Sequence, residues 1–286
     1  MKVALCCIGR LENRYAVEFV AYYKQLGFDH IYIADNNYNG EEYFEDVLQN
    51  YIDENFITIY NYRNKEWIGW FAYSEMYQKI YNIYDWVAFF DFDEFLTLEK
   101  DKNIKEYLSR KCFNKYNQIL INWRTYTDND LIYDDGRGCL ERFTKPMPLH
   151  KYIQYNDYEE NEHVKCIIRG NINNLTISIH LSEDEKLKET TCNSIGKKVN
   201  TIPFQKINYK FAYIKHFTTK TIDEWINYKI KRRVADRSIN DFNRHYPLER
   251  FFKINKLTKE KKQFLKNNNI NVPNINDCKN FIIRWD

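Results

Sequence analysis

The stretch Asp85-Trp86-Val87-Ala88-Phe89-Phe90-Asp91-Phe92-Asp93-Glu94-Phe95 joins a bulky apolar run to three carboxylates within four positions. Its first part, Trp86 to Phe90, predicts a strand that is buried on both faces. Asp91 and Asp93 follow at the point where that strand leaves the sheet. Residues two apart on an extended chain point the same way, so both carboxylates can face one point. Hard oxygen ligands at the carboxyl end of a buried strand predict a divalent-cation site, and the cation can hold a diphosphate.

Strand and helix patterns alternate through the first third of the chain. Strands are expected at 2–8, 30–34 and 56–60, before the run at 86–90, with one-faced helices between them. This order predicts an α/β fold whose parallel strands are joined by right-handed crossovers. The loops that follow Ile8, Ala34 and Phe90 are therefore expected at one edge of the sheet, where such folds bind ligands.

The second half of the chain is less regular. It predicts strands at 118–122, 163–169, 175–180 and 211–216, of which the second and third are paired, and a helix at 221–234. Polar loops are expected at 124–138 and at 182–200, the latter mobile. The predicted organisation is a single domain over residues 1–248 followed by a basic, Asn-rich C-terminal extension over residues 249–286.

Composition and charge exclude several classes of protein. With 44% hydrophobic residues, 286 residues can build a large core, and the net charge of +3 does not predict nucleic-acid binding. Six basic residues crowd one late segment and fit a solvated helix face, with a phosphate-facing patch or an anionic membrane surface as the alternatives: Lys229, Lys231, Arg232, Arg233, Arg237 and Arg244.

Cysteine usage and the chain's start indicate a location. The seven cysteines form no C-x-x-C pair, so we expect no zinc cluster and a reducing compartment. Cys6, Cys7 and Cys166 lie in apolar runs and are expected in the core. The N-terminus is too short for a signal-peptide core, and no run is long enough to span a membrane. We expect a cytoplasmic protein, with a peripheral contact to the inner membrane face left open.

The first two loops offer candidate ligands for a nucleotide. Arg10 and the amides that open the following helix can meet a phosphate, although Glu12 can equally serve as a helix cap. No G-x-G-x-x-G motif is present, so dinucleotide binding lacks its signature. Asp35 and Asn36 suit a base or ribose edge, and an ordinary turn is the alternative.

The acidic turn also has an alternative interpretation, in which Asp93 and Glu94 cap the next element. We favour a cation because unpaired charge beside an apolar strand is costly, and a cation would relieve the repulsion. His216, at the end of a predicted strand, is the expected third ligand, and His180 is its rival. Lys220 follows His216 and is a candidate clamp for the diphosphate.

Several blocks carry a resemblance to a known family. The opening block comprises Arg10-Leu11-Glu12-Asn13, Glu18-Phe19 and Leu26-Gly27-Phe28-Asp29-His30-Ile31-Tyr32-Ile33. It resembles the opening of glycosyltransferase family 92 and its bacterial relatives, often labelled family-2-like glycosyltransferases. Asp91-Phe92-Asp93-Glu94-Phe95 resembles their D-x-D motif. Later blocks of the bacterial group resemble Trp123-Arg124, Glu141-Arg142-Phe143, and His216-Phe217-Thr218-Thr219-Lys220-Thr221 with Glu224. The resemblance covers residues 2 to about 235.

The resemblance implies a GT-A fold, with a Rossmann-like, mostly parallel sheet flanked by helices and a less regular acceptor side. It implies a nucleotide-diphosphate sugar donor, with a UDP-sugar expected, and Mn²⁺ or Mg²⁺ bridging Asp91 or Asp93 to the diphosphate. It also implies a role in surface polysaccharide or lipopolysaccharide assembly, with a saccharide or lipid-linked acceptor. Inversion is expected by analogy.

The acceptor side is less defined by the sequence. Inversion needs a carboxylate base within hydrogen-bond reach of the acceptor hydroxyl, and Asp128 and Glu141 are the candidates. Both can equally be acids that solubilise a loop. Trp123 can stack on an acceptor sugar or lie buried.

Two other functions compete with a glycosyltransferase. Haloacid-dehalogenase-like phosphatases also place D-x-D after an apolar strand, but normally on the first strand and followed by Thr or Val. Here three strands precede the motif and Glu94-Phe95 follows it. A non-catalytic module that binds a sugar or nucleotide on the same fold is the second alternative, and an intact D-x-D motif argues against it.

Overall fold

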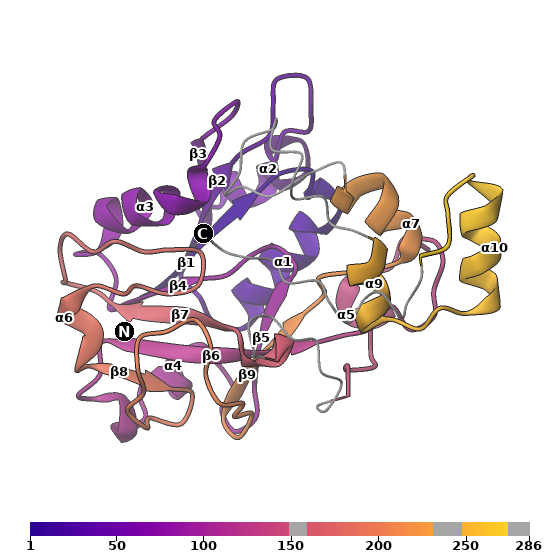
Figure 1. Cartoon of the computed structure of the whole chain (residues 1–286). Helices are drawn as coiled ribbons and strands as arrows, with labels where there is room; N and C mark the ends of the chain where they lie inside the picture. Colours follow the sequence, from indigo (N-terminus) through magenta and orange to yellow (C-terminus); the bar gives the residue numbers. More distant parts are fainter. Residues whose placement is uncertain (149–158, 231–247, 274–286) are drawn as a thin grey trace. The chain divides into compact units, whose positions relative to one another are not determined.

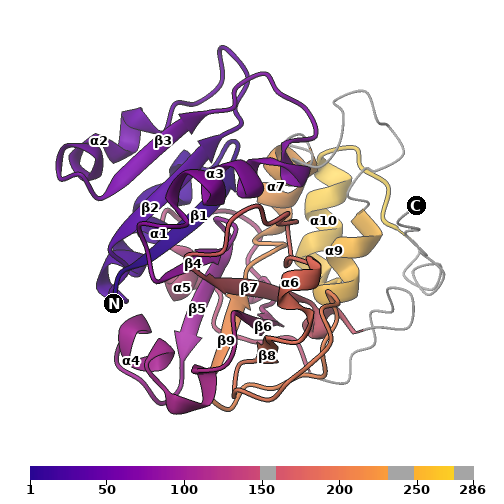
Figure 2. The same ribbon diagram turned by 90° about the vertical axis from the view of Figure 1, so that its left-hand side faces the viewer.

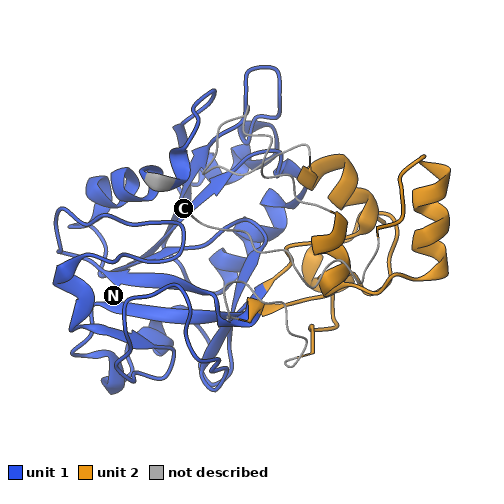
Figure 3. Ribbon diagram, viewed as in Figure 1, with its two compact units in different colours: residues 1–123, 161–215, 235–238 blue, residues 124–160, 216–234, 239–286 orange. Residues whose placement is uncertain are grey.

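The chain divides into two compact units, which Figure 3 colours separately. This computed structural model describes residues 1–148, 159–230 and 248–273. Unit 1 contains Met1–Trp123 and Asn161–Lys215, and unit 2 contains the described residues of Arg124–Glu160, His216–Val234 and Ile239–Asp286. The sequence-based division at residue 248 stays a prediction.

The strands belong to one mixed sheet (Figure 1). They are β1 (Val3–Gly9), β2 (His30–Asp35), β3 (Ile57–Asn61), β4 (Trp86–Phe89), β5 (Glu94–Leu98), β6 (Gln118–Thr125), β7 (Val164–Arg169), β8 (Thr191–Asn193) and β9 (Ala212–His216). Their order is β3-β2-β1-β4-β7-β6-β9-β5, and β8 pairs with β6.

The helices of unit 1 are α1 (Asn13–Gln25), α2 (Glu45–Asp53), η1 (Ile68–Trp70), α3 (Ala72–Ile80), α4 (Ile104–Leu108), η2 (Lys111–Phe113) and α6 (Glu185–Lys188). Those of unit 2 are α5 (Cys139–Arg142), α7 (Ile222–Glu224), η4 (Trp225–Lys229), α9 (Leu248–Ile254) and α10 (Lys259–Asn267). A short turn, η3 (Glu160–Glu162), lies where the chain passes between the units. None of the helices in the described parts of the chain has the length and apolar character needed to cross a membrane.

The first four strands form the parallel part of the sheet, as the sequence predicts. β1 pairs in parallel with β2 and with β4, and β2 pairs in parallel with β3. All four residues of β4 are buried, which confirms a strand covered on both faces. Ala4, Cys6 and Phe89 belong to the apolar cluster that includes α3. On the other face, Tyr23 of α1 stacks on Phe90 with ring centroids 5.9 Å apart. The α/β fold prediction is therefore confirmed.

The strand order places a topological switch between β1 and β4. The chain builds β1, β2 and β3 outward in one direction, and β4 then returns to the free side of β1. Figure 2 shows β1 and β2 running side by side with α3 across them. In open α/β sheets, ligands bind beyond the carboxyl ends of the strands at such a switch. The loops after Gly9 and after Phe90 flank this position.

Two sequence predictions for the second half are wrong. Residues 175–180 are not a strand, and β7 pairs antiparallel with β4 and with β6 instead. The backbone at Ile177 is satisfied by a side chain: its N–H donates to Ser74 Oγ at 2.8 Å, and that hydroxyl donates to its carbonyl at 3.3 Å. The expected loop at 182–200 contains α6 and β8.

Unit 2 has an apolar core of its own. It is formed by Ile222, Trp225, Phe251, Phe252, Phe264 and Leu265. The helix predicted at 221–234 begins after Thr221, whose side chain caps it in a reciprocal box with Glu224. The rest of that helix beyond residue 230, together with the basic residues Lys231 to Arg244, lies outside the described part of the chain.

Candidate functional site

The acidic turn is anchored by the aromatic residue between its two aspartates. Phe92 is buried and packs on Phe19, with ring centroids 4.7 Å apart, and on Phe44, stacked at 5.1 Å. The turn closes with a hydrogen bond from the Glu94 amide to the Asp91 carbonyl at 3.0 Å. The chain is thus turned here rather than extended, so the two-residue alternation that predicts matching directions for Asp91 and Asp93 does not apply. Asp91 keeps 39% of its side chain exposed, whereas Asp93 is buried.

A buried lysine, which the sequence analysis missed, lies against the turn. Lys165 Nζ donates to Asp91 Oδ2 at 2.7 Å and lies 3.6 Å from Glu94 Oε2. The other oxygen of Asp91 accepts from the Tyr73 hydroxyl at 2.9 Å. Glu94 Oε2 accepts from the Asp91 amide at 2.9 Å, which ties the turn to the start of β5. Both oxygens of Asp91 therefore already have partners within unit 1.

Burial and neighbouring charges shift the protonation equilibria of these groups. Burial raises the pKa of Glu94 well above its usual range, and the charges of Asp91 and Asp93 add to this, while Lys165 opposes it. Burial alone would lower the pKa of Lys165, but the carboxylates of Asp91 and Glu94 outweigh it and raise the pKa. Lys165 is consequently held as the ammonium ion.

The donor set of the turn fits a divalent cation. The turn carries three acidic side chains within four positions, and among the described residues Glu94 Oε1 is buried without a hydrogen-bond partner. Within the same residues, no three His, Cys, Asp or Glu side chains are arranged to hold a metal ion. Mg²⁺ and similar ions are often held by only one or two carboxylates and complete their shells with water and substrate phosphates. Asp91 and Asp93 are the residues that would hold such an ion.

Gly9, at the end of β1, permits the close packing beneath the turn. A Cβ on Gly9 would lie 2.5 Å from Phe92 Cε2 and 2.6 Å from Phe44 Cζ. We expect Gly9→Ala to reduce the free energy of unfolding by about 1–3 kcal/mol, because both buried rings must move. Urea denaturation would measure this loss. A free energy of unfolding equal to that of the wild-type protein would contradict the prediction.

The first loop is held by charge pairing to the second. Arg10 donates to both carboxylate oxygens of Glu41, at 3.0 and 2.6 Å, and its guanidinium lies 4.2 Å from the ring centroid of Tyr38. Glu12 is buried at the N-cap position of α1 but makes no side-chain capping bond. Donor binding by Arg10 and Glu12 stays a prediction.

The second loop is organised around Asp35. This buried carboxylate accepts from Arg63 Nη1 at 2.6 Å and from the amide and side chain of Asn37 at 2.9 and 2.7 Å. Asn36 donates to the carbonyls of Tyr62 and Lys65 at 3.2 and 2.9 Å. Both predicted donor ligands thus shape the loop, and Arg63 is a second residue that the sequence analysis missed. Neither contact tests donor binding, which stays a prediction.

Trp123 is the last residue of β6 that belongs to unit 1, and it lies in a group of aromatic side chains. It is buried and stacks on His163, with ring centroids 4.7 Å apart, and the ring of His180 lies at 5.4 Å. His180 Nδ1 lies 3.0 Å from the Val164 carbonyl oxygen. His180, the alternative to His216 as the predicted metal ligand, therefore has one ring nitrogen in contact with a backbone carbonyl. Trp123 as an acceptor platform stays a prediction.

The remaining predicted site residues belong to unit 2. His216 is buried at the end of β9, and Lys220 adopts a positive φ of 53°. Asp128 is buried and pairs with Lys261 at 2.5 Å, and burial raises its pKa despite that ammonium. Glu141 is exposed on α5 and pairs with Arg137 at 3.2 Å. Metal binding by His216, donor binding by Lys220, and the base role of Asp128 or Glu141 stay predictions.

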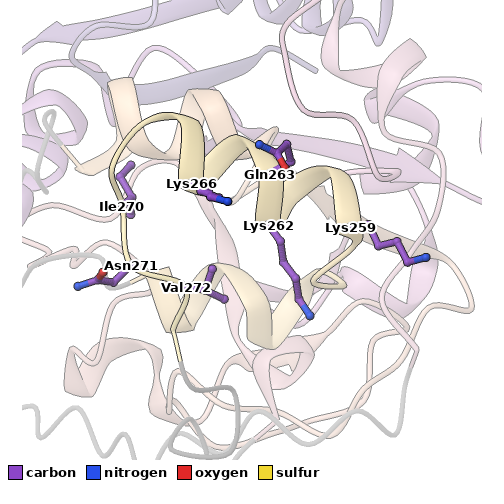
Figure 4. A pocket seen from close by; sticks show the side chains of 7 residues that line it. All are labelled: Lys259, Lys262, Gln263, Lys266, Ile270, Asn271 and Val272. Atoms are coloured by element: carbon purple, nitrogen blue, oxygen red, sulfur yellow. The ribbon is translucent and has the colours of Figure 1, made fainter.

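Two surface hollows lie apart from every predicted site residue. Figure 4 shows the one beside α10, of about 440 Å³, whose lining includes Lys259, Lys262 and Lys266. The other, of about 780 Å³, lies beside the end of α1 and the start of α4 and is lined by residues such as Gln25 and Asn103. Neither includes the acidic turn, so we assign neither to the candidate site.

Comparison with known proteins identifies the class. The family model for glycosyltransferase family 92 matches residues 5–246, and the chain therefore belongs to this family. This confirms the family resemblance. A glycosyltransferase family 92 protein of Ricinus communis is 24% identical over 160 residues, which cover 53% of this chain and 28% of that protein. The chain thus matches little more than a quarter of the length of this curated relative.

Solved structures give a fainter likeness. Residues 1–349 of TarS from S. aureus share 12% identity, with a TM-score of 0.42 over 76% of this chain and 61% of that chain. The same protein in complex with UDP-GlcNAc shares 11% identity, with a TM-score of 0.38 over 59% and 45%. With both scores below 0.5, the assignment rests on the family model.

Proposed function

We propose that this chain is a glycosyltransferase that moves a sugar from a nucleotide-diphosphate sugar, a UDP-sugar in the first instance, to a saccharide or lipid-linked acceptor. The observation that carries the proposal is the acidic turn at the carboxyl end of β4, beside the switch to β1, in a chain of glycosyltransferase family 92. The sugar donor is a diphosphate, and a divalent cation on carboxylates is a common way to bind one.

The first two loops are the proposed nucleotide-binding elements. Both follow strands that end at the same edge of the sheet, since Gly9 pairs with Asp35 in the β1–β2 register. The contacts among Asp35, Arg63 and Asn37 hold the second loop in shape before a ligand arrives. A preorganised loop binds with less loss of conformational freedom, which supports its assignment to the donor.

Mn²⁺ or Mg²⁺ bound at Asp91 and Asp93 would supply neutralisation of the charge that develops on the leaving diphosphate. Phe92, which lies between the two aspartates in the chain, anchors the turn through its buried ring. Lys220 is the proposed additional positive group on the diphosphate.

The proposed outcome is inversion, for which an acceptor hydroxyl needs a carboxylate base. Asp128 and Glu141 are the proposed candidates for this base. We propose a place in surface polysaccharide or lipopolysaccharide assembly.

A thermal-shift screen of nucleotide sugars with and without Mn²⁺ tests the donor. At about 100 times its Kd, a true donor stabilises the folded state by about 2.7 kcal/mol, which corresponds to a rise in Tm on the order of 5 °C. We expect this rise with a UDP-sugar and Mn²⁺ together. No rise with any nucleotide sugar at millimolar concentration would contradict the proposal.

Activity separates the proposed transferase from its competitors. Metal-dependent release of UDP from a UDP-sugar supports the transferase, and hydrolysis of a generic phosphomonoester supports a phosphatase. Sugar or nucleotide binding with neither activity supports a non-catalytic module. The position of the D-x-D turn after the fourth strand, and Glu94 as the start of β5, favour the transferase over the phosphatase.

A further inference from the structure

Lys165 reaches the acidic turn because of the register between β7 and β4. These strands are antiparallel, with Ala88 opposite Ile167, and continuing this register places Lys165 opposite Phe90, one residue before the turn. Its side chain is only 1% exposed. Burying an ammonium costs several kcal/mol unless it is paired, so its position depends on the carboxylates that it meets.

Lys165 contacts two of the three acidic side chains of the turn. Its ammonium donates to Asp91 Oδ2 at 2.7 Å and lies 3.6 Å from Glu94 Oε2, and Glu94 is fully buried. Asp91 and Glu94 are further tied to each other by the hydrogen bond from the Asp91 amide. Two acidic side chains of the turn therefore share the contact with one ammonium of the protein.

We propose that Lys165 is the resident counter-ion of the acidic turn. Its ammonium holds Asp91 and Glu94 in place when no divalent cation is bound, and a cation that binds at the turn does so against the field of this ammonium. This inference rests on the proposed cation site and goes beyond it.

The arrangement has a consequence for the order of binding. Lys165 contacts Asp91, so its ammonium would repel a divalent cation held by Asp91, and the cation alone would bind weakly. A diphosphate brings negative charge and oxygen ligands, which offset that repulsion. Lys165 thus favours entry of the cation together with the donor over binding of the bare ion. It acts as a positioning residue, since its contacts are to the carboxylates.

Calorimetric titration with Mn²⁺ alone, in the absence of donor, tests this role. We expect Lys165→Met to bind Mn²⁺ at least tenfold more tightly than the wild-type protein, because the repelling charge is gone. Lys165→Arg keeps the charge and should bind as the wild type does. Lys198→Met removes an exposed ammonium that pairs with Glu189 on the surface, and it should leave the Kd for Mn²⁺ unchanged. An unchanged or larger Kd in Lys165→Met would overturn the proposal.

Thermal unfolding in EDTA and in Mn²⁺ provides a second measurement if the variant folds poorly. Without the ammonium, Asp91 and Glu94 lose their shared partner, so Lys165→Met should lose stability in EDTA and regain most of it in Mn²⁺. Failure to fold in both conditions would overturn the proposal, because the cation then does not replace the ammonium. The proposed function is tested separately, on the wild-type protein. Full transfer activity of the wild-type protein in EDTA would contradict the metal dependence in the proposed function, whatever the Lys165→Met variant does.

Discussion

Asp93→Ala should lower metal-dependent turnover of the donor by at least 100-fold while the fold survives. A metal ion that polarises a leaving diphosphate contributes several kcal/mol of transition-state stabilisation, and a 100-fold loss corresponds to about 2.7 kcal/mol. Asp93 is one of the two aspartates of the D-x-D turn and is buried. The Phe92 anchor, which packs on Phe19 and Phe44, is untouched by the substitution.

Release of UDP from a UDP-sugar, measured across a Mn²⁺ titration, gives the turnover, and circular dichroism during heating reports the fold. Asp53→Ala removes an exposed carboxylate that accepts from Gln49 at 2.8 Å on α2 and should retain wild-type turnover. Turnover retained by Asp93→Ala, with Mn²⁺ still required, would contradict the assignment of Asp93 as a metal ligand.

Glu224→Ala should reduce the free energy of unfolding of unit 2 by about 3–5 kcal/mol. Glu224 accepts from Arg142, whose side chain is fully buried, at 3.1 and 3.4 Å. Removing one partner of a buried ion pair leaves an uncompensated charge, which has a cost of this size. The variant also loses the hydrogen bond from the Thr221 amide to the Glu224 carboxylate, which adds about 1 kcal/mol. Asp134 lies 2.9 Å from Arg142 and still pairs with it in the variant. We therefore expect a loss near the lower end of the stated range.

Hydrogen exchange of the amides in residues 222–229 measures this loss within unit 2 itself. The matched control is Arg137→Ala, close to Arg142 in the sequence. It breaks the exposed ion pairs of Arg137 with Asp135 and Glu141. Exposed pairs contribute about 0–1 kcal/mol, so exchange should barely change. A loss below about 1 kcal/mol in Glu224→Ala would show that the buried pair is not what stabilises this unit.

The parallel half of the sheet follows from local patterns. The apolar runs that form β1, β2, β3 and β4 are separated by one-faced helices, and each observed strand lies within one residue of its predicted bounds. For β1, β2 and β4 the pattern worked because strands covered on both faces contain few polar residues. It failed at 175–180, where a side chain from α3 satisfies the backbone in place of a neighbouring strand. It also missed β5, because a strand that begins with a buried glutamate carries no apolar signature at its start.

The sequence by itself determined the acidic turn, its position after the fourth strand and the family to which the chain belongs. Only the tertiary structure decided what surrounds the turn. Lys165 lies 74 residues from Asp91 in the sequence and reaches it through the pairing of β7 with β4. In the same way, Arg142 and Glu224 lie in two separate family-like blocks, and the fold joins them as a buried pair. Local patterns follow from the period of a helix or strand, whereas a buried charge finds its counter-ion through strand pairing and packing across the whole chain.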